Sequence, residues 1–251
     1  MMDAYTHLDM GAGDPVGDLK LRMRDAGVDR ALIVETWGKD NRCCLDELLA
    51  APSAQFRLAP CFRPEEGTTC AEAVHHAMVG AIRVRTADMR ALGQLATELE
   101  ASGRWLLPHA ELGIKALVDE LLPLAAGYPE LHVMVPHMGW PRRDGRDDPD
   151  WRESIAALGE LPHCLVGVSA IAHFSRDAYP HGDLKPFVAH LLAVFGAESL
   201  VAASDYPLFE RSRYREYMDL ALEWMERCDA GDAKLERSLF GDEERAGTRR
   251  S

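Results

Sequence analysis

Short apolar runs rich in β-branched residues alternate along the chain with stretches whose apolar residues have helical spacing. The runs predict strands at 3–8, 31–36, 57–62, 80–84, 105–109, 131–136, 164–169 and 199–204. The helical pattern predicts helices at 15–26, 42–51, 69–78, 88–102, 113–127, 151–160, 184–196 and 211–228. This alternation favours an α/β fold, a single-domain (β/α)8 TIM barrel of about 250 residues. A doubly wound sheet is the competing fold, but no glycine-rich fingerprint opens the first helix.

Two polar segments stand apart from this alternation. The stretch 140–150 (WPRRDGRDDPD) is long and charged for a loop between a strand and a helix, which is typical of a lid or a binding loop. The last residues, 241–251, are almost entirely polar and predict a disordered tail. The barrel domain is therefore expected to occupy residues 1–240.

Five polar residues interrupt the apolar runs at four of the predicted strand ends. They are His7, Asp9, His109, His137 and Asp205. The carboxyl ends of the strands in a parallel barrel meet at one mouth, where active sites form. Histidine and carboxylate side chains bind divalent metals and act as general acids and bases. The sequence therefore predicts one pocket that holds these five side chains.

Each of these residues also has a purely structural interpretation. His7 could be a hydrogen-bonded core histidine, with Asp9 capping the loop that follows it. His109 comes after a proline and could be a turn residue, and Asp205 could cap the turn before Pro207. The spacing favours function at the later strand ends. For the first pair it leaves both interpretations open.

Arginines form a second set near the predicted strand ends. Arg63 ends the third strand, and Arg83 and Arg85 lie two residues apart on the fourth, so they share one face. The guanidinium fork binds carboxylates, and the three arginines together predict a small anionic substrate. Pairing with a nearby Asp or Glu is the alternative for each of them. Three further side chains are expected to line the pocket: Glu35, Trp37 and Tyr206.

Composition narrows the function classes. The chain carries 28 Lys and Arg against 41 Asp and Glu, a formal net charge of −13, which argues against nucleic acid and anionic membranes as partners. The N-terminus lacks the basic and apolar regions of a signal peptide, so a cytoplasmic location is expected. The six cysteines form no CxxC pair and predict reduced thiols. A homo-oligomer is left open.

Taken in order, the segments THLD, GAIRV, LLPHAEL, YPELHVMVPHMGWP and LVAASDYPL resemble the amidohydrolase superfamily, specifically its amidohydrolase-related branch. That branch contains metal-dependent decarboxylases and lactone hydrolases, including metal-independent ones. His7, His109, His137 and Asp205 match its histidine and aspartate positions. Asp9 departs from the pattern, because it stands where the family usually has the second histidine of a His-x-His pair.

The resemblance implies a hydrolase of a small carboxylated substrate, best described as a lactone or cyclic amide. It implies one divalent ion, zinc-like or manganese-like, held by His7, Asp9, His109 and Asp205. Asp205 and His137 would be catalytic, and the substrate would contact four residues: Arg63, Arg83, Arg85 and Tyr206. Without a metal, Asp205 would activate the water directly. The alternatives are a non-oxidative decarboxylase of a small unsaturated or aromatic acid and a non-catalytic barrel that binds a small acid.

Overall fold

The computed structural model of this chain describes residues 1–37, 42–51, 53–66, 73–142, 148–208, 211–226, 228 and 230–241. The strands in this part of the chain are β1 (Met2–Thr6), β2 (Arg30–Val34), β3 (Phe56–Ala59), β4 (Ala81–Arg85), β5 (Trp105–His109), β6 (His132–Val135), β7 (Cys164–Val168) and β8 (Leu200–Ala202). They form parallel ladders in the order β1-β2-β3 and β4-β5-β6-β7-β8. Every predicted strand is present, although several are shorter than expected.

Backbone hydrogen bonds join the two ladders into a closed barrel. Between β3 and β4, the Arg83 amide donates to the Pro60 carbonyl (2.9 Å) and the Phe62 amide donates to the Arg83 carbonyl (2.7 Å). Between β8 and β1, the Asp205 amide donates to the Tyr5 carbonyl over 2.9 Å. The predicted (β/α)8 barrel is therefore confirmed, and the doubly wound alternative is not what forms.

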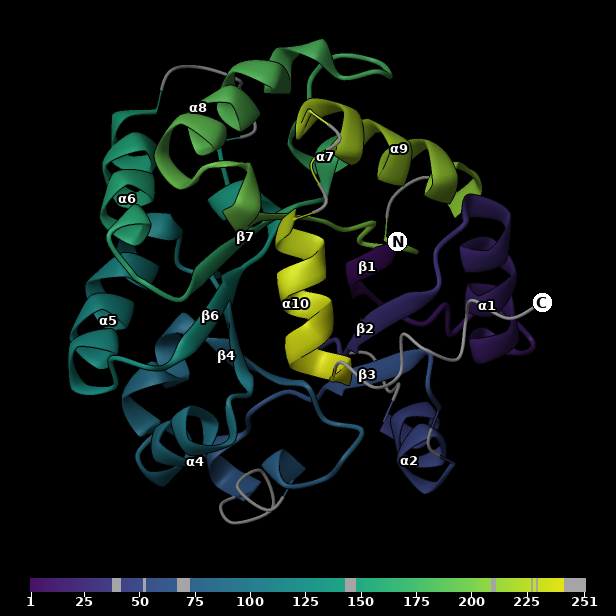
Figure 1. Cartoon of the computed structure of the whole chain (residues 1–251), viewed down its shortest axis with the longest axis horizontal. Helices are drawn as coiled ribbons and strands as arrows, with labels where there is room; N and C mark the ends of the chain where they lie inside the picture. Colours follow the sequence, from purple (N-terminus) through teal and green to yellow (C-terminus); the bar gives the residue numbers. More distant parts are fainter. Residues whose placement is uncertain are drawn as a thin grey trace.

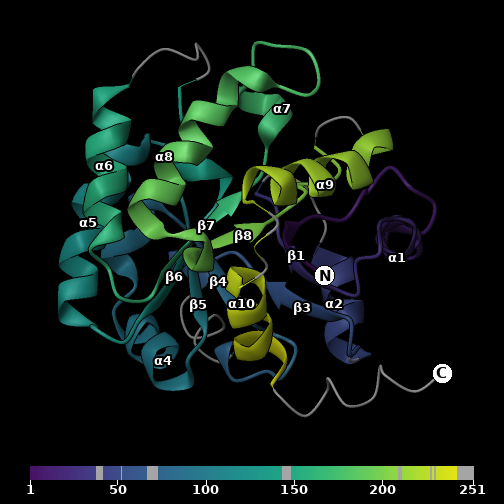
Figure 2. The same cartoon turned by 45° about the horizontal axis from the view of Figure 1, so that its top comes forward.

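Helices surround this barrel on the outside (Figures 1 and 2). They are α1 (Pro15–Ala26), α2 (Arg42–Ala50), α4 (Gln94–Ser102), α5 (Ile114–Gly127), α6 (Pro149–Gly159), α7 (Ile171–Phe174), α8 (Lys185–Phe195) and α9 (Tyr214–Trp224). The helix expected at 88–102 divides into a 3-10 segment, Thr86–Ala91, and α4. Of the helix expected at 69–78, residues 69–72 lie outside the described residues, and only 73 and 74 of the described part are helical before a turn. Residues 143–147 of the predicted loop and the tail beyond residue 241 also lie outside the described residues.

Local sequence explains where α1 begins and ends. The Asp14 side chain accepts a hydrogen bond from the Gly17 amide at the start of the helix, and Pro15 occupies the first turn. Gly27 ends the helix in the left-handed region, at φ 70°. Leu19 and Met23, one turn apart, point into the core. The start, the end and the buried face of α1 therefore all follow from its residues.

A helix that the sequence analysis did not predict, α10 (Ala230–Phe240), lies across the amino-terminal ends of the strands. The Trp105 indole donates to the Ser238 hydroxyl (2.9 Å), and Arg57 Nε donates to the Leu239 carbonyl (2.8 Å). The Phe240 ring packs under the guanidinium of Arg57, which lies 4.3 Å from its centroid. Helix α10 therefore closes this end of the barrel and leaves the carboxyl ends of the strands for a site.

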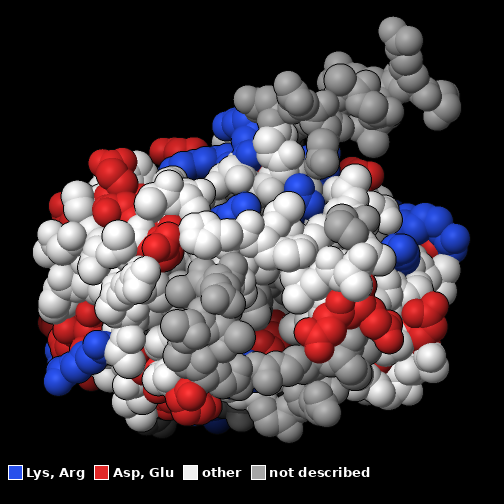
Figure 3. Space-filling model, turned by 90° about the horizontal axis from the view of Figure 1, so that it is seen from below, with Lys and Arg blue, Asp and Glu red and all other residues white. Residues whose placement is uncertain are grey.

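The outer surface carries both signs of charge. In the face shown in Figure 3, acidic and basic side chains form separate small clusters rather than one large patch of a single sign. None of the helices in the described ranges is long and apolar enough to cross a membrane. Three cysteines whose side chains are described, Cys61, Cys164 and Cys228, are free thiols.

Candidate active site

The carboxyl ends of the strands bring four of the predicted residues into one buried cluster. His7 follows β1, His137 follows β6 and Asp205 follows β8, and all three side chains are buried. His109 is the last residue of β5 and lies opposite Arg85 of β4 in the ladder. The rings of His109 and His137 both contact Trp140, with centroids 5.7 and 5.3 Å away. This arrangement agrees with the prediction that these residues share the mouth of the barrel.

His7 and Asp205 lie closest to one another in the cluster. His7 Nδ1 is 2.6 Å from the Val34 carbonyl, which can only accept, so Nδ1 carries the hydrogen. Nε2 then lies 3.5 Å from Asp205 Oδ1, as a lone pair when the ring is neutral and as an ion-pair donor when it is protonated. Both atoms are buried and have no hydrogen-bond partner. With the ring neutral, two acceptors converge here, which suits a water that donates both of its hydrogens, or a cation.

The backbone at Asp205 is held in an uncommon conformation. Its φ is +55°, in the left-handed region that non-glycine residues rarely adopt. Its amide donates to the Tyr5 carbonyl (2.9 Å), and its carbonyl accepts from the Leu208 amide (3.1 Å). Burial alone would raise the pKa of the Asp205 carboxyl. The neighbouring His137, His7 and Arg83 have the larger, opposite effect, so this pKa lies below its usual value. Asp205 is therefore ionised at neutral pH.

His137 is aimed at Asp205 by a left-handed turn. Residues 137–140 have φ values of 58°, 53°, 69° and 53°. A Cβ on Gly139 would lie 2.7 Å from Ile155 Cδ1, so a larger residue there would displace that side chain, and glycine also suits the positive φ. His137 Nδ1 lies 2.9 Å from the Ser169 hydroxyl, and Nε2 lies 4.0 Å from Asp205 Oδ1. Burial lowers the pKa of His137 to about 4, so the ring is neutral at pH 7.

Arg83 is the predicted arginine that joins this cluster. Its Nη1 donates to the Glu35 carbonyl (2.7 Å), and its Nη2 lies 3.3 Å from His109 Nδ1. The guanidinium stacks on Trp37, 4.4 Å from the ring centroid. Burial and the Arg83 charge lower the pKa of His109 to about 4.

The other predicted substrate contacts are paired elsewhere. Arg63 forms a fork on the Glu35 carboxylate, with distances of 2.5 and 3.2 Å. Arg85 donates to Asp88 (2.7 Å), and its side chain is 42% exposed. These two arginines follow the ion-pair alternative. The Tyr206 hydroxyl donates to the Asp18 carboxylate of α1. Their assignment to the substrate stays a prediction that these contacts do not favour.

Two contributors to the cluster were missed from the sequence. Ser169 follows β7 and accepts from the His137 amide (3.1 Å) as well as contacting its ring. Tyr5 lies within β1, and its ring contacts His7 and His137 with centroids 5.2 and 4.7 Å away. Ser169 had one available signal, because it ends a predicted strand in the same position as the other site residues.

The predicted four-residue metal set does not converge. Asp9 Oδ1 accepts from the Gly11 amide (3.0 Å), and His109 turns Nδ1 toward the Arg83 guanidinium. Among the four predicted ligands, all of which lie in the described ranges, only His7 and Asp205 place buried atoms without a hydrogen-bond partner near one another. Within the described ranges, no group of three or more His, Cys, Asp or Glu side chains is arranged to hold a metal ion. The contacts of these side chains therefore do not favour the predicted four-ligand metal site. The site stays a prediction.

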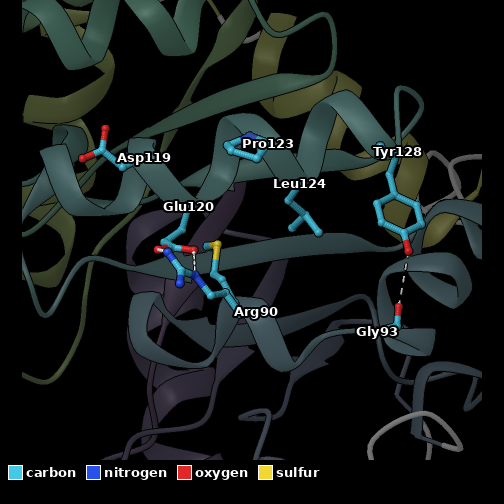
Figure 4. Close-up of a pocket in the computed structure, with 9 residues that line it drawn as sticks. Arg90, Gly93, Asp119, Glu120, Pro123, Leu124 and Tyr128 are labelled. Atoms are coloured by element: carbon cyan, nitrogen blue, oxygen red, sulfur yellow. Dashed lines mark hydrogen bonds and ion pairs between the residues drawn. The ribbon is translucent and has the colours of Figure 1, made fainter.

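A groove of about 370 Å³ between the 3-10 segment Thr86–Ala91 and α5 is a second concave feature (Figure 4). Arg90 spans it to Glu120, with distances of 2.7 and 2.5 Å between their charged atoms. The Tyr128 hydroxyl lies 3.5 Å from the Gly93 carbonyl at its other end. Because its main charged groups neutralise one another, this groove is a weaker candidate than the barrel mouth.

A curated relative matches part of the chain in sequence. The L-fucono-1,5-lactonase of Burkholderia ambifaria is 28% identical over 131 residues, which are 49% of this chain and 44% of the lactonase. The chain thus matches less than half the length of this curated relative.

Solved structures match over nearly the whole chain. An amidohydrolase from Burkholderia multivorans with bound zinc has a TM-score of 0.74 at 17% identity, covering 95% of this chain and 98% of that one. A probable 2-pyrone-4,6-dicarboxylic acid hydrolase from Acinetobacter baumannii, with citric acid bound, has a TM-score of 0.75 at 16% identity, with coverages of 96% and 99%. The 5-carboxyvanillate decarboxylase of Sphingomonas paucimobilis is less similar, with a TM-score of 0.59 at 13% identity over 95% and 98%.

At these identities the structures establish the fold alone. The family model for amidohydrolases matches residues 5–242, which contain the end of β1, the whole of β2 to β8 and all of the clustered histidines and aspartate. The chain is therefore a member of the amidohydrolase family of enzymes.

Proposed function

We propose that this protein hydrolyses the ester bond of a small lactone, with Asp205 as the general base. The observation that carries this proposal is the convergence of Asp205 Oδ1 and His7 Nε2, two buried atoms without partners 3.5 Å apart. A water that donates one hydrogen to each atom would present its oxygen lone pairs to a substrate. The partial match to a lactonase supports the choice of an ester ring.

The steps follow from the protonation states. Ionised Asp205 takes a proton from the water as the water oxygen bonds to the lactone carbonyl carbon. The carbonyl oxygen gains negative charge, which a hydrogen bond from His109, supported by the adjacent Arg83 charge, stabilises. The ring C–O bond then breaks, and the leaving oxygen receives the proton that Asp205 holds, directly or through the neighbouring His137. The product is an open hydroxy acid, and Asp205 returns to its ionised state.

The same cluster supports an anionic substrate. Arg63 and Arg85 are engaged by Glu35 and Asp88, so of the three predicted arginines Arg83 is the one whose charge lies in the cluster. Its surroundings are aromatic, with Trp37 and Tyr5 against the guanidinium at 4.4 and 5.6 Å. One cation in an apolar setting suits a single carboxylate better than a dicarboxylate.

A comparison of two reactions tests this proposal. The purified protein is incubated with a panel of sugar lactones and unsaturated carboxylated lactones, and separately with aromatic carboxylic acids. Acid release is followed by pH-stat, and carbon dioxide release is followed by a coupled assay. We expect acid release from at least one lactone, abolished in the Asp205→Asn variant. Carbon dioxide release without lactone hydrolysis would establish the decarboxylase alternative instead.

A further inference from the structure

We infer that Arg83 is a positioning residue that fixes His109 as the tautomer with its hydrogen on Nε2. In this state His109 offers the pocket a hydrogen-bond donor rather than a metal-binding lone pair. One part of this inference, the contact between the Nε2 donor and the substrate carbonyl, rests on the proposed function. The assignment of the proton does not, because it follows from the contacts of the two side chains.

The geometry starts from the strands. Arg83 pairs with Leu107 in the β4–β5 ladder, and His109 lies two residues further along β5. Both side chains therefore emerge on the inner face of the barrel. The Arg83 guanidinium is held by the Glu35 carbonyl at Nη1 (2.7 Å) and by the Trp37 ring face, which leaves Nη2 directed at His109 Nδ1 over 3.3 Å.

The chemistry of the guanidinium then places the proton. Arginine carries only N–H donors and stays charged in proteins. His109 Nδ1 must therefore accept, which requires its lone pair, and the hydrogen of the neutral ring lies on Nε2. A ring bound to a metal through Nε2 would carry its hydrogen on Nδ1 and set one donor against another at 3.3 Å.

The packing around the ring agrees with a fixed orientation. The Trp37 and Trp140 rings pack against it with centroids 5.2 and 5.7 Å away, which restricts rotation of the imidazole. The resemblance to the amidohydrolase superfamily implies that His109 binds a metal. The contacts hold it as a hydrogen-bond donor instead, and Arg83 acts through it.

Long-range proton–nitrogen NMR on protein labelled with ¹⁵N-histidine tests this inference. The chain has 10 histidines, so the His109 signals are identified by their loss in the His109→Gln variant. We expect the wild-type ring to show a protonated Nε2 and an unprotonated Nδ1 at pH 7. Adding zinc chloride should leave both signals in place. A protonated Nδ1, or a zinc-dependent shift of Nε2, would overturn the inference without the need for any variant at Arg83.

Variants then test the role of Arg83. Arg83→Met removes every donor, and Arg83→Lys keeps a charge without the fork. In Arg83→Met we expect the His109 ring to populate both tautomers, whereas Arg85→Lys, two residues along the same strand, should leave the His109 spectrum unchanged. If a folded Arg83→Met variant retains the single Nε2–H tautomer, Arg83 does not position the ring. If the wild-type protein shows the expected tautomer but hydrolyses no lactone, the result counts against the proposed function alone.

Discussion

Asp205 Oδ1 and His7 Nε2 face each other across 3.5 Å in the barrel mouth, and neither atom has a hydrogen-bond partner. The Val34 carbonyl fixes the His7 ring from behind, and the left-handed backbone at Asp205 fixes the carboxylate. Unpaired buried acceptors cost stability, and proteins keep such arrangements mainly where function needs them. This pair is the reason to place the attacking water between His7 and Asp205.

Metal removal should leave hydrolysis intact. Of the four predicted ligands, only His7 and Asp205 place buried atoms without a hydrogen-bond partner near one another, which is fewer ligands than a catalytic metal usually takes from the protein. We expect protein dialysed against a chelator, then exchanged into metal-free buffer, to keep its rate of lactone opening. Elemental analysis of the same sample is the control. Activity that disappears with the metal and returns with added zinc would contradict this expectation.

Arg63 should matter for stability rather than for substrate affinity. Its fork on Glu35 satisfies a carboxylate that is only 3% exposed. Arg63→Gln leaves that carboxylate with the Cys61 amide as its remaining partner and should lower the free energy of unfolding by about 1.5–3 kcal/mol. Urea unfolding measures this loss, and the KM for the best lactone should stay unchanged. A stable variant with a raised KM would return Arg63 to the substrate site.

Asp3 should make stability depend on pH. Burial raises its pKa from 3.8 to about 6, although it accepts from the Ser204 hydroxyl (2.6 Å) and the Tyr214 hydroxyl (2.8 Å). A raised pKa in the folded state means that the stabilisation is complete below pH 3.8 and is lost as the pH rises through 6. Relative to Asp3→Asn, the wild type should therefore lose up to about 3 kcal/mol of unfolding free energy between pH 4 and 7.

Urea denaturation of both proteins across this pH range gives the difference directly. A difference that grows in favour of the wild type at higher pH would mean that its donors hold Asp3 as the carboxylate. The sign of the slope thus decides between burial and hydrogen bonding as the stronger effect at this residue.

The closure of the barrel by α10 should be sensitive to one glycine. A Cβ on Gly231 would lie 2.0 Å from the Leu200 carbonyl oxygen, whereas one on Gly182 would meet nothing within 4 Å. Gly231→Ala should push α10 away from β8 and lower the unfolding free energy by about 1–3 kcal/mol. Gly182→Ala is the matched control and should change it by less than about 0.5 kcal/mol. Equal melting temperatures for the two variants would refute this role of the contact.

The strand ends were predictable because periodicity and polar interruptions lie in the sequence itself. The barrel and the clustering of His7, His109, His137 and Asp205 followed from that pattern. Helix α10 was missed because its core residues, such as Leu235 and Leu239, form too short an apolar stripe to be distinguished from a polar tail. Its stability comes from contacts with strands far away in sequence.

The partners of the arginines could not be predicted either. Glu35 precedes Arg63 by 28 residues and Arg83 by 48, and it meets both only through strand register and rotamer choice. The same contacts decide the proton position on His109, which no spacing rule reports. Residue type thus located the site, and the fold decided which side chains still have free groups within it.

The Asp205→Asn variant tests the central claim most directly. Asparagine keeps the shape of the side chain but cannot take a proton, and general base roles contribute typically 10²–10⁴-fold. Turnover of the best lactone and the melting temperature are measured on the same preparation. The account predicts a loss of kcat on that scale in a protein that is still folded. A folded variant with nearly full turnover would remove Asp205 from the chemistry and contradict the account.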